Sequence, residues 1–386
     1  MKTNKKIGIG LMSGTSLDGV DAVLVEIENY GVETKVEVLD FISYSISDDL
    51  KQRILENCVP ETSSVDAITS LNVELGELWC DAVQHLLDHS SWDRPVDFIA
   101  SHGQTIYHQP KPLNSFVRST LQIGDPSTLA YRFKTDVVFN FRMMDMVDGG
   151  DGAPLVPYSE YLLYHSNEET TLLQNIGGIG NVTVIPKGST LDDVRAFDTG
   201  PGNMMINAAT AYYYNEAYDK DGNYAKQGKL IPELLNNLLK HDYLQIQPPK
   251  STGREMFGEE YVKQICDIYP ASANDVIATL THFTALTISN SYKQFIIPNL
   301  PVDRVVLGGG GAYNPVLVSL IQEYLPEIPV LTQESLGHSS DAKEAIAFAI
   351  LGNETLNRQS SNVPSATGAK HHLILGQISP NPWVLE

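Results

Sequence analysis

A short polar turn near the start of the chain combines residue types that suit phosphate binding. The apolar run 7–12 leads into Ser, Gly and Thr residues, and a second apolar run, 22–27, follows. A tight turn of small residues exposes several backbone N–H groups side by side, and such a row binds phosphate oxygens. Asp18 lies inside this turn, where a carboxylate suits a hydrated Mg²⁺ on a nucleotide. The turn therefore predicts a site for a nucleotide phosphate.

A second turn with an acid occurs later in the chain. Asp198 precedes a Thr-Gly-Pro-Gly turn, and a helix is expected to begin at Met204. A helix start with free N–H groups favours an anion, and a carboxylate beside an anion is suited to hold Mg²⁺ or accept a proton. Together with the first turn, this favours Asp198 as a general base in phosphoryl transfer. The alternative is that Asp198 only caps the turn after it.

A run of four glycines, 308–311, is the third candidate. It follows an expected strand, 304–307, and precedes Asn314. Glycines let a flat ligand approach the backbone closely, so an adenosine pocket fits this segment, with Asn314 available for a polar contact. A simple turn between a strand and a helix explains the same run equally well.

Polar residues follow three expected strands in the first part of the chain. The side chains of interest are His102, Gln104, Asp125 and Arg142. Strand ends build the binding crevice of an open α/β sheet, and mixed donors and acceptors there suit a sugar. Arg142 is suited to pair with a carboxylate. The alternatives are a hydrogen-bonded loop histidine for His102 and an ion pair with Asp145 or Asp148 for Arg142.

The elements that must position these residues form two similar series. Strand, glycine turn and strand open the chain and recur at 171–185, and alternating helices and strands follow each time. The expected strands are 7–12, 22–27, 35–44, 98–100, 121–123, 137–140, 194–197 and 304–307, and the longest expected helices are 65–86, 259–268, 274–295, 315–324 and 342–351. The repeat indicates an internal duplication.

We therefore expect an α/β protein of two lobes with a nucleotide cleft between them. A Gly-rich segment, 149–154, marks a sharp change of composition near the boundary. The expected N-terminal lobe is 1–145 and the expected C-terminal lobe is 146–351. The last segment, 352–386, with a short strand at 373–375, is expected to pack back on the N-terminal lobe.

Composition excludes several classes of protein. The 386 residues carry a net charge of −21, whereas nucleic-acid binding needs basic patches. No apolar run approaches the ~20 residues that span a bilayer, and the start is too short and Gly-rich for a signal peptide. Three widely spaced cysteines have no metal-ligand spacing. These features predict a cytoplasmic protein that binds neither membranes nor nucleic acid.

Taken together, the segments resemble the anhydro-N-acetylmuramic acid kinase family of the sugar kinase, heat-shock-70 and actin superfamily. The resemblance covers nearly the whole chain. It is carried by residues 12–21, 101–105, 122–126, 140–142, 149–157, 175–181, 197–203, 250–255 and 308–314.

The resemblance implies a duplicated, two-lobed RNase-H-like fold and a homodimeric enzyme of peptidoglycan recycling. Such enzymes use ATP, Mg²⁺ and water to open the 1,6-anhydro ring of 1,6-anhydro-N-acetylmuramic acid. They phosphorylate O6, which gives N-acetylmuramate 6-phosphate and ADP. The alternative is a non-catalytic sensor on the same fold that binds ATP and muropeptides without turnover.

The resemblance also assigns residues to roles. It places the water-activating base at Asp198 and a second acid at Glu344, although a solvated helix face is the ordinary role for Glu344. The residues assigned to ATP are Gly14, Thr15, Ser16, Leu17, Asp18, Gly19, Val20, Asp21, Thr199, Gly200, Gly202, Asn203, Gly309, Gly310 and Asn314. The residues assigned to the sugar are His102, Gln104, Asp125, Arg142 and Gly150. Asp151 departs from the family, because Gln is expected there and Asp is shorter and anionic.

Overall fold

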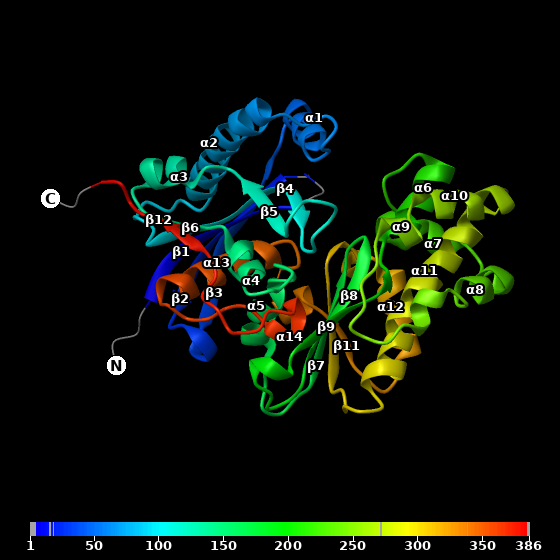
Figure 1. Cartoon of the computed structure of the whole chain (residues 1–386). Helices are drawn as coiled ribbons and strands as arrows, with labels where there is room; N and C mark the ends of the chain where they lie inside the picture. Colours follow the sequence, from blue (N-terminus) through cyan, green and yellow to red (C-terminus); the bar gives the residue numbers. More distant parts are fainter. Residues whose placement is uncertain (1–4, 15–16, 18, 271, 338, 384–386) are drawn as a thin grey trace. The chain divides into compact units, whose positions relative to one another are not determined.

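The computed structural model describes residues 5–383 except 15, 16, 18, 271 and 338 (Figure 1). The chain divides into two compact units: unit 1 comprises Met1–Leu163 and Ala342–Glu386, and unit 2 comprises Tyr164–Asp341. The boundaries differ from those expected at 145 and 351, because residues 146–163 and the helix at 343–356 belong to unit 1. No helix within the described residues is both long and apolar enough to cross a membrane.

Unit 1 contains a seven-stranded mixed sheet in the order β12-β6-β4-β1-β2-β3, with β5 paired to β4. Strands β1, β2 and β3 are antiparallel neighbours, whereas β4 runs parallel to β1 and β6 parallel to β4. The strands are β1 (Lys5–Ser13), β2 (Gly19–Glu28), β3 (Lys35–Ser45), β4 (Phe98–Gln109), β5 (Ser119–Ile123), β6 (Asp136–Phe139) and β12 (Gln377–Ser379).

Helices cover both faces of this sheet (Figure 1). Successive side chains of a strand point to opposite faces, so Ile9 and Leu11 pack with α2 while Gly10 faces α13. A Cβ at Gly10 would lie 2.0 Å from the carbonyl oxygen of Ala345, so glycine is needed for α13 to lie this close to β1. The helices of unit 1 are α1 (Asp48–Asn57), α2 (Val65–His89), α3 (Pro126–Phe133), α4 (Phe141–Val147), α5 (Val156–Tyr164), α13 (Lys343–Leu356) and α14 (Pro364–Thr367), with a 3₁₀ turn at Gly31–Glu33.

Unit 2 repeats this sheet with the order β11-β10-β7-β8-β9. Again three strands are antiparallel neighbours, and β10 and β11 extend the sheet in parallel. The strands are β7 (Thr171–Ile176), β8 (Ile179–Ile185), β9 (Arg195–Pro201), β10 (Arg304–Gly308) and β11 (Val330–Thr332). The shared order and strand directions confirm the duplication expected from the sequence and the ribonuclease-H-like topology that the family resemblance implies.

The helices of unit 2 gather around the long helix α11, which packs against β9 and α12 (Figure 1). They are α6 (Met204–Tyr214), α7 (Asn223–Gln227), α8 (Pro232–Leu238), α9 (Arg254–Phe257), α10 (Glu259–Ile268), α11 (Ala273–Ser291) and α12 (Pro315–Tyr324). A π turn, Tyr292–Ile296, continues α11, and 3₁₀ turns lie at Leu191–Asp193, Lys220–Gly222, Asp242–Gln245, Gly310–Tyr313 and Glu334–Leu336.

Two expected strands are corrected. β4 does not end at Ala100 but continues to Gln109, because β5 pairs with its second half where the pairing with β1 becomes irregular after Leu11. The strand expected at 373–375 is wrong. The backbone of Leu373 instead pairs with Ser361 and with the side chain of Asn362, and the edge strand β12 forms further on, against β6.

Candidate active site

The first phosphate turn connects β1 to β2 in unit 1. Thr15, Ser16 and Asp18 lie outside the described residues, so the predicted Mg²⁺ ligand Asp18 stays a prediction. Leu17 has a left-handed backbone, with φ 58°, and its N–H donates to the Gly14 carbonyl at 3.3 Å. Its side chain is buried in the core of unit 1.

The last three residues assigned to this turn, Gly19, Val20 and Asp21, belong to β2 and pair with β3. The Val20 side chain is also buried in the core of unit 1. Because both side chains are buried, Leu17 and Val20 can contact a nucleotide only through their backbone atoms.

Gln104 links the sugar candidates to the phosphate turn. Its Oε1 accepts a hydrogen bond of 2.7 Å from the Ser13 hydroxyl, one residue before Gly14, and the Gln104 side chain is buried. Gln104 therefore holds the end of β1, and its side-chain oxygen is already in use.

His102 and Arg142 are brought into direct contact. Arg142 lies in the first turn of α4, and its Nε donates to His102 Nε2 at 3.0 Å. The other ring nitrogen of His102, Nδ1, lies 2.8 Å from the carbonyl oxygen of Gly103. A carbonyl only accepts, so Nδ1 carries the proton and His102 is the neutral Nδ1–H tautomer. Burial, followed by the charge of Arg142, lowers the pKa of His102 to about 3.

Asp145 organises the segment beside Arg142, a role that the sequence did not reveal. It makes no ion pair with Arg142. Its buried carboxylate accepts from Gly152 N at 2.9 Å, Asn362 Nδ2 at 3.0 Å and Thr367 Oγ1 at 2.8 Å. The Gly152 carbonyl in turn accepts from Arg142 Nη1 at 2.8 Å. Asp145 thus holds the loop that holds Arg142.

Two other sugar candidates have structural partners. Asp125 caps α3, because its Oδ1 accepts from Ser127 N at 2.8 Å, while Oδ2 lies 3.3 Å from Asn72 Nδ2. Gly150 is buried beside Asp145, and its carbonyl accepts from Arg118 Nη1 at 2.9 Å. For both residues, the observed contacts support the architecture of unit 1.

Glu344 lies in the first turn of α13 and is exposed. Its negative charge raises the pKa of Arg142, against the stronger lowering by burial, so the two side chains are electrostatic neighbours. One helical turn further along α13, the Phe348 ring lies 4.8 Å from the His102 ring. The same face of α13 therefore brings Glu344 toward the pair His102 and Arg142.

Asp151, the departure from the family, is half-buried and lies near His108. The pKa of His108 is lowered by burial and by the charge of Arg142, and raised less by the backbone and the charge of Asp151. His108 Nδ1 also lies 3.0 Å from the Thr120 hydroxyl. His108 is a neighbour of the Arg142 site that the sequence argument missed.

In unit 2, Asp198 lies within β9 and is held by the segment around residue 250. Its Oδ2 accepts from Thr252 N at 2.9 Å, and its own N–H donates to the Lys250 carbonyl at 3.0 Å. Tyr243 donates its hydroxyl to the Asp198 carbonyl at 2.8 Å. Burial raises the pKa of Asp198, while the Thr252 N–H and the charge of Lys250 oppose that shift.

Lys250 also lies beside Asp198, and the sequence did not predict a role for it. Its side chain is buried, and its Nζ lies 4.7 Å from the ring centres of both Tyr243 and Phe295. Burial lowers the pKa of Lys250 to about 8, and the charge of Asp198 opposes this. The available signal was the segment 250–255, which matches the family but was not connected to Asp198.

The second phosphate turn does not have the free N–H groups that the sequence predicts at residues 202–204. The N–H groups of Gly202, Asn203 and Met204 donate to the carbonyls of Gly177 and Gly178, so they are not free for an anion. The two turns are packed tightly, and a Cβ at Gly202 would lie 2.3 Å from the Gly177 oxygen.

Thr199 is also engaged within unit 2. Its buried hydroxyl donates to the Gly180 carbonyl at 3.0 Å. The next residue, Gly200, has φ 144° and packs against Thr287 of α11. Thr199 and Gly200 therefore fix the course of β9 toward the turn.

The glycine run 308–311 and Asn314, the third candidate for nucleotide binding, lie at the wall of a cavity. Asn203, Gly310 and Asn314 line a cavity of about 410 Å³ together with Ile206, Asn207, Tyr218, Asp219, Lys220, Asp221 and Tyr313. The Asn314 side chain also caps α12, accepting from Val316 N at 3.1 Å. Gly309, with φ 78°, lies where β10 ends and the 3₁₀ turn of the cavity wall begins. The structure thus unites residues from the second and third candidates.

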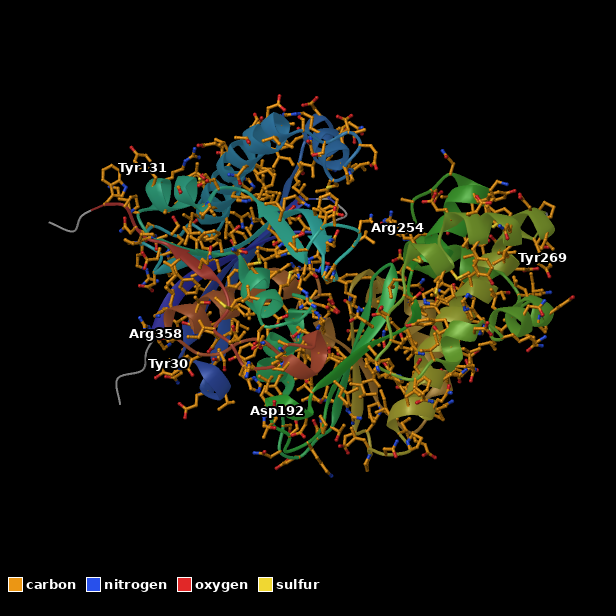
Figure 2. All side chains as sticks on the ribbon, viewed as in Figure 1. Tyr30, Tyr131, Asp192, Arg254, Tyr269 and Arg358 are labelled. Carbon is orange, nitrogen blue, oxygen red and sulfur yellow. The ribbon has the colours of Figure 1, made fainter. Side chains whose placement is uncertain are left out.

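Arg254 lies at the start of α9 and is exposed (Figure 2). With Gly178 and Met204 it lines a groove of about 570 Å³. A positive side chain is therefore present in the same groove as the Gly177–Gly178 turn. Among the described residues, no group of three or more His, Cys, Asp or Glu side chains is arranged to hold a metal ion.

The sequence of this chain is similar to one protein family over nearly its whole length. Residues 6–381 match the family model described as anhydro-N-acetylmuramic acid kinase. The chain is 54% identical over 377 residues to the protein of that name from Clostridioides difficile, covering 97% of this chain and 98% of the relative. A relative of the same name from Bacillus cereus (strain G9842) is 50% identical, with 97% and 99% covered. One from Caldanaerobacter subterraneus is 47% identical, with 97% of each covered.

Proposed function

Because this chain belongs to the anhydro-N-acetylmuramic acid kinase family, we propose that it phosphorylates 1,6-anhydro-N-acetylmuramic acid with ATP. Water adds to the anomeric carbon, and the bond from that carbon to O6 breaks. O6 then attacks the γ-phosphorus, and the bond to ADP breaks. The products are N-acetylmuramate 6-phosphate and ADP. The sensor alternative has no support among the relatives compared, which carry the name of the kinase.

The observation that carries the proposed mechanism is the setting of Asp198. Its carboxylate is oriented by the Thr252 N–H, and burial raises its pKa, which makes it a stronger base than an exposed aspartate. We assign to Asp198 the removal of a proton from the attacking water. The proton passes to solvent after the products leave. Glu344, an exposed acid, is assigned to orienting that water.

We assign recognition of the sugar to Arg142. N-acetylmuramic acid carries a carboxylate on its lactyl group, and a guanidinium forms charge-assisted hydrogen bonds with a carboxylate. Arg142 is held at Nε and Nη1 by His102 and Gly152, and this supports a fixed orientation of its Nη2 group. Gln104, Asp125 and Gly150 support the site by holding β1, α3 and the Gly-rich loop.

We assign the cavity of about 410 Å³ to the nucleoside part of ATP. Its size suits a small ligand, and Asn203 and Asn314 offer polar contacts on its wall. The phosphates are assigned to the turns at 14–18 and 177–178 and to Arg254, whose guanidinium suits phosphate oxygens. We assign to Thr199, Gly200 and Gly202 a structural role, which is to fix the backbone of the turn at 199–202.

Mg²⁺ is proposed to enter with ATP. It commonly keeps several waters and binds one or two carboxylates together with the phosphates of its nucleotide, so it needs no dedicated cluster of protein ligands. That donor chemistry fits a turn with a single acid, and Asp18 is the residue assigned to it. When bound, Mg²⁺ neutralises charge that develops on the transferred phosphoryl group.

One experiment tests the reaction. The protein is mixed with ATP, Mg²⁺ and 1,6-anhydro-N-acetylmuramic acid, and mass spectrometry should find a product heavier by one water and one phosphoryl group. Asp198→Asn should lower kcat by about 10²- to 10⁴-fold while the Kd for ATP changes little. Near-normal turnover of this variant would refute the base assignment. Omission of Mg²⁺, with a chelator added, should abolish turnover.

The assembly and the compartment are also proposals. We propose a homodimer in the cytoplasm, as the family resemblance implies. Light scattering coupled to size-exclusion chromatography tests the first, because a 42.5 kDa chain gives a dimer of twice that mass. Fractionation of cells that make the protein tests the second.

A further inference from the structure

We propose that His102 is a positioning residue, which fixes Arg142 for the sugar and takes no part in proton transfer. This inference rests on the proposed role of Arg142. It differs from the sequence expectation, in which His102 itself contacts the substrate.

Both ring nitrogens of His102 are occupied inside unit 1. Nδ1–H donates to the Gly103 carbonyl at 2.8 Å, and Nε2 accepts from Arg142 Nε at 3.0 Å. The residue is only 4% exposed. A ring whose two nitrogens both have partners has no position left at which it could bind a sugar hydroxyl or carry a proton to it.

The contact with Nε fixes the plane of the guanidinium. Arg142 Nη1 donates to Gly152 O at 2.8 Å, so the group is held at two points. The guanidinium is planar, and two fixed points determine where Nη2 points. Removal of the His102 acceptor would leave only the Gly152 contact, and the guanidinium could then rotate.

The surroundings keep His102 neutral. The Phe348 ring of α13 lies 4.8 Å from the His102 ring and shields it from solvent on that side. The charged and titratable groups that face this site are Arg142 on α4, His108 on β4 and Glu344 on α13. Burial, then the charge of Arg142, lowers the pKa of His102 to about 3. A neutral imidazole is the form that can accept from Arg142.

The test uses steady-state kinetics of the full-length protein with 1,6-anhydro-N-acetylmuramic acid. His102→Phe keeps a ring against Phe348 but removes the acceptor, and it should raise the KM for the sugar about tenfold, the usual effect of losing one hydrogen bond. The KM for ATP should be unchanged. His102→Gln offers a side-chain oxygen to Arg142 Nε and should restore part of the loss.

The double variant separates positioning from direct contact. If His102 acts through Arg142, His102→Phe should add nothing to the effect of Arg142→Ala, whereas independent contacts would multiply. Multiplying effects would overturn the inference. The matched control is His282→Phe in unit 2, a half-buried histidine beside Tyr324, which should leave the KM for the sugar unchanged.

The outcomes also separate this inference from the proposed function. If Arg142→Ala raises the KM and His102→Phe does not, His102 has no positioning role and Arg142 keeps its own. If Arg142→Ala leaves the KM unchanged, the role of Arg142 fails and the inference fails with it. A measurement on the unaltered protein needs no variant to fold: ¹⁵N NMR should show the neutral Nδ1–H tautomer of His102 from about pH 5 to 8. Protonation in that range would overturn the inference.

Discussion

Replacement of Asp145 by alanine should destabilise unit 1 and weaken sugar binding together. The carboxylate is fully buried, and three donors converge on it: Gly152 N, Asn362 Nδ2 and Thr367 Oγ1. Two of these donors belong to the C-terminal segment, so a single side chain joins α4, the Gly-rich loop and residues 362–367.

The expected magnitude comes from these donors. A buried donor left without a partner costs about 1–3 kcal/mol. With three donors stranded, and water able to enter the space vacated by the carboxylate, we expect a loss of about 3–5 kcal/mol in the free energy of unfolding. Asp145→Asn keeps one acceptor oxygen but places an NH₂ group opposite one donor, which then has no acceptor. The free energy of unfolding should therefore fall by about 1–3 kcal/mol in this variant.

The assay can be restricted to unit 1. All three tryptophans, Trp79, Trp92 and Trp383, lie in unit 1, so tryptophan fluorescence during urea unfolding reports that unit. The control is Asp81→Ala, which removes an exposed ion pair with Arg132 and should change stability by less than about 1 kcal/mol. The KM for the sugar should rise in Asp145→Ala, because Gly152 no longer holds Arg142.

A loss below about 1 kcal/mol in Asp145→Ala, comparable to the Asp81 control, would refute this reasoning. It would mean that the three donors find other partners without cost. A stable variant with an unchanged KM would also show that the Gly-rich loop holds its shape without Asp145.

Three further predictions concern unit 2. Lys250→Met removes a positive charge that favours ionised Asp198, so the pKa of Asp198 should rise. The acid limb of the pH profile of kcat/KM should then move up by about one pH unit. An unshifted acid limb would show that the charge of Lys250 does not act on Asp198. Gly202→Ala places a Cβ against the Gly177 carbonyl and should destabilise unit 2 by about 1–3 kcal/mol. Hydrogen exchange of the amides of β7–β9 measures this loss. Unchanged exchange would show that a Cβ at residue 202 fits without strain. Arg254→Ala should raise the KM for ATP about tenfold without changing the KM for the sugar, and equal changes in both would argue against a role at the phosphates.

Much of the fold could be predicted from the sequence because its signals are local. Short apolar runs predicted β1 and β2, and alternating apolar residues predicted β3. The recurrence of strand, glycine turn and strand predicted the duplication. The length of β4 could not be predicted this way. It depends on β5, a partner from later in the chain, and the polar residues of β4 read as a loop until that pairing is known.

The types of residue at the candidate site, but not their tasks, could also be predicted. Asp198, Arg142 and His102 were recognised as chemical groups from their neighbours in the chain. Their tasks depend on atoms distant in sequence: Thr252 orients Asp198, and Asp145 binds Thr367. The sequence predicts free N–H groups at residues 202–204, yet these groups donate to the carbonyls of Gly177 and Gly178.

The sequence by itself determined that this chain is a duplicated α/β protein with the residue types of a sugar kinase, because periodicity and short motifs are carried by neighbouring residues. Only the tertiary structure decided which of these groups are already engaged. Each hydrogen-bonding atom has few partners, and a histidine with both nitrogens bound cannot serve a substrate however suitable its type. Burial, which shifts the pKa of Asp198 upward and that of His102 downward, is likewise a property of the packed fold.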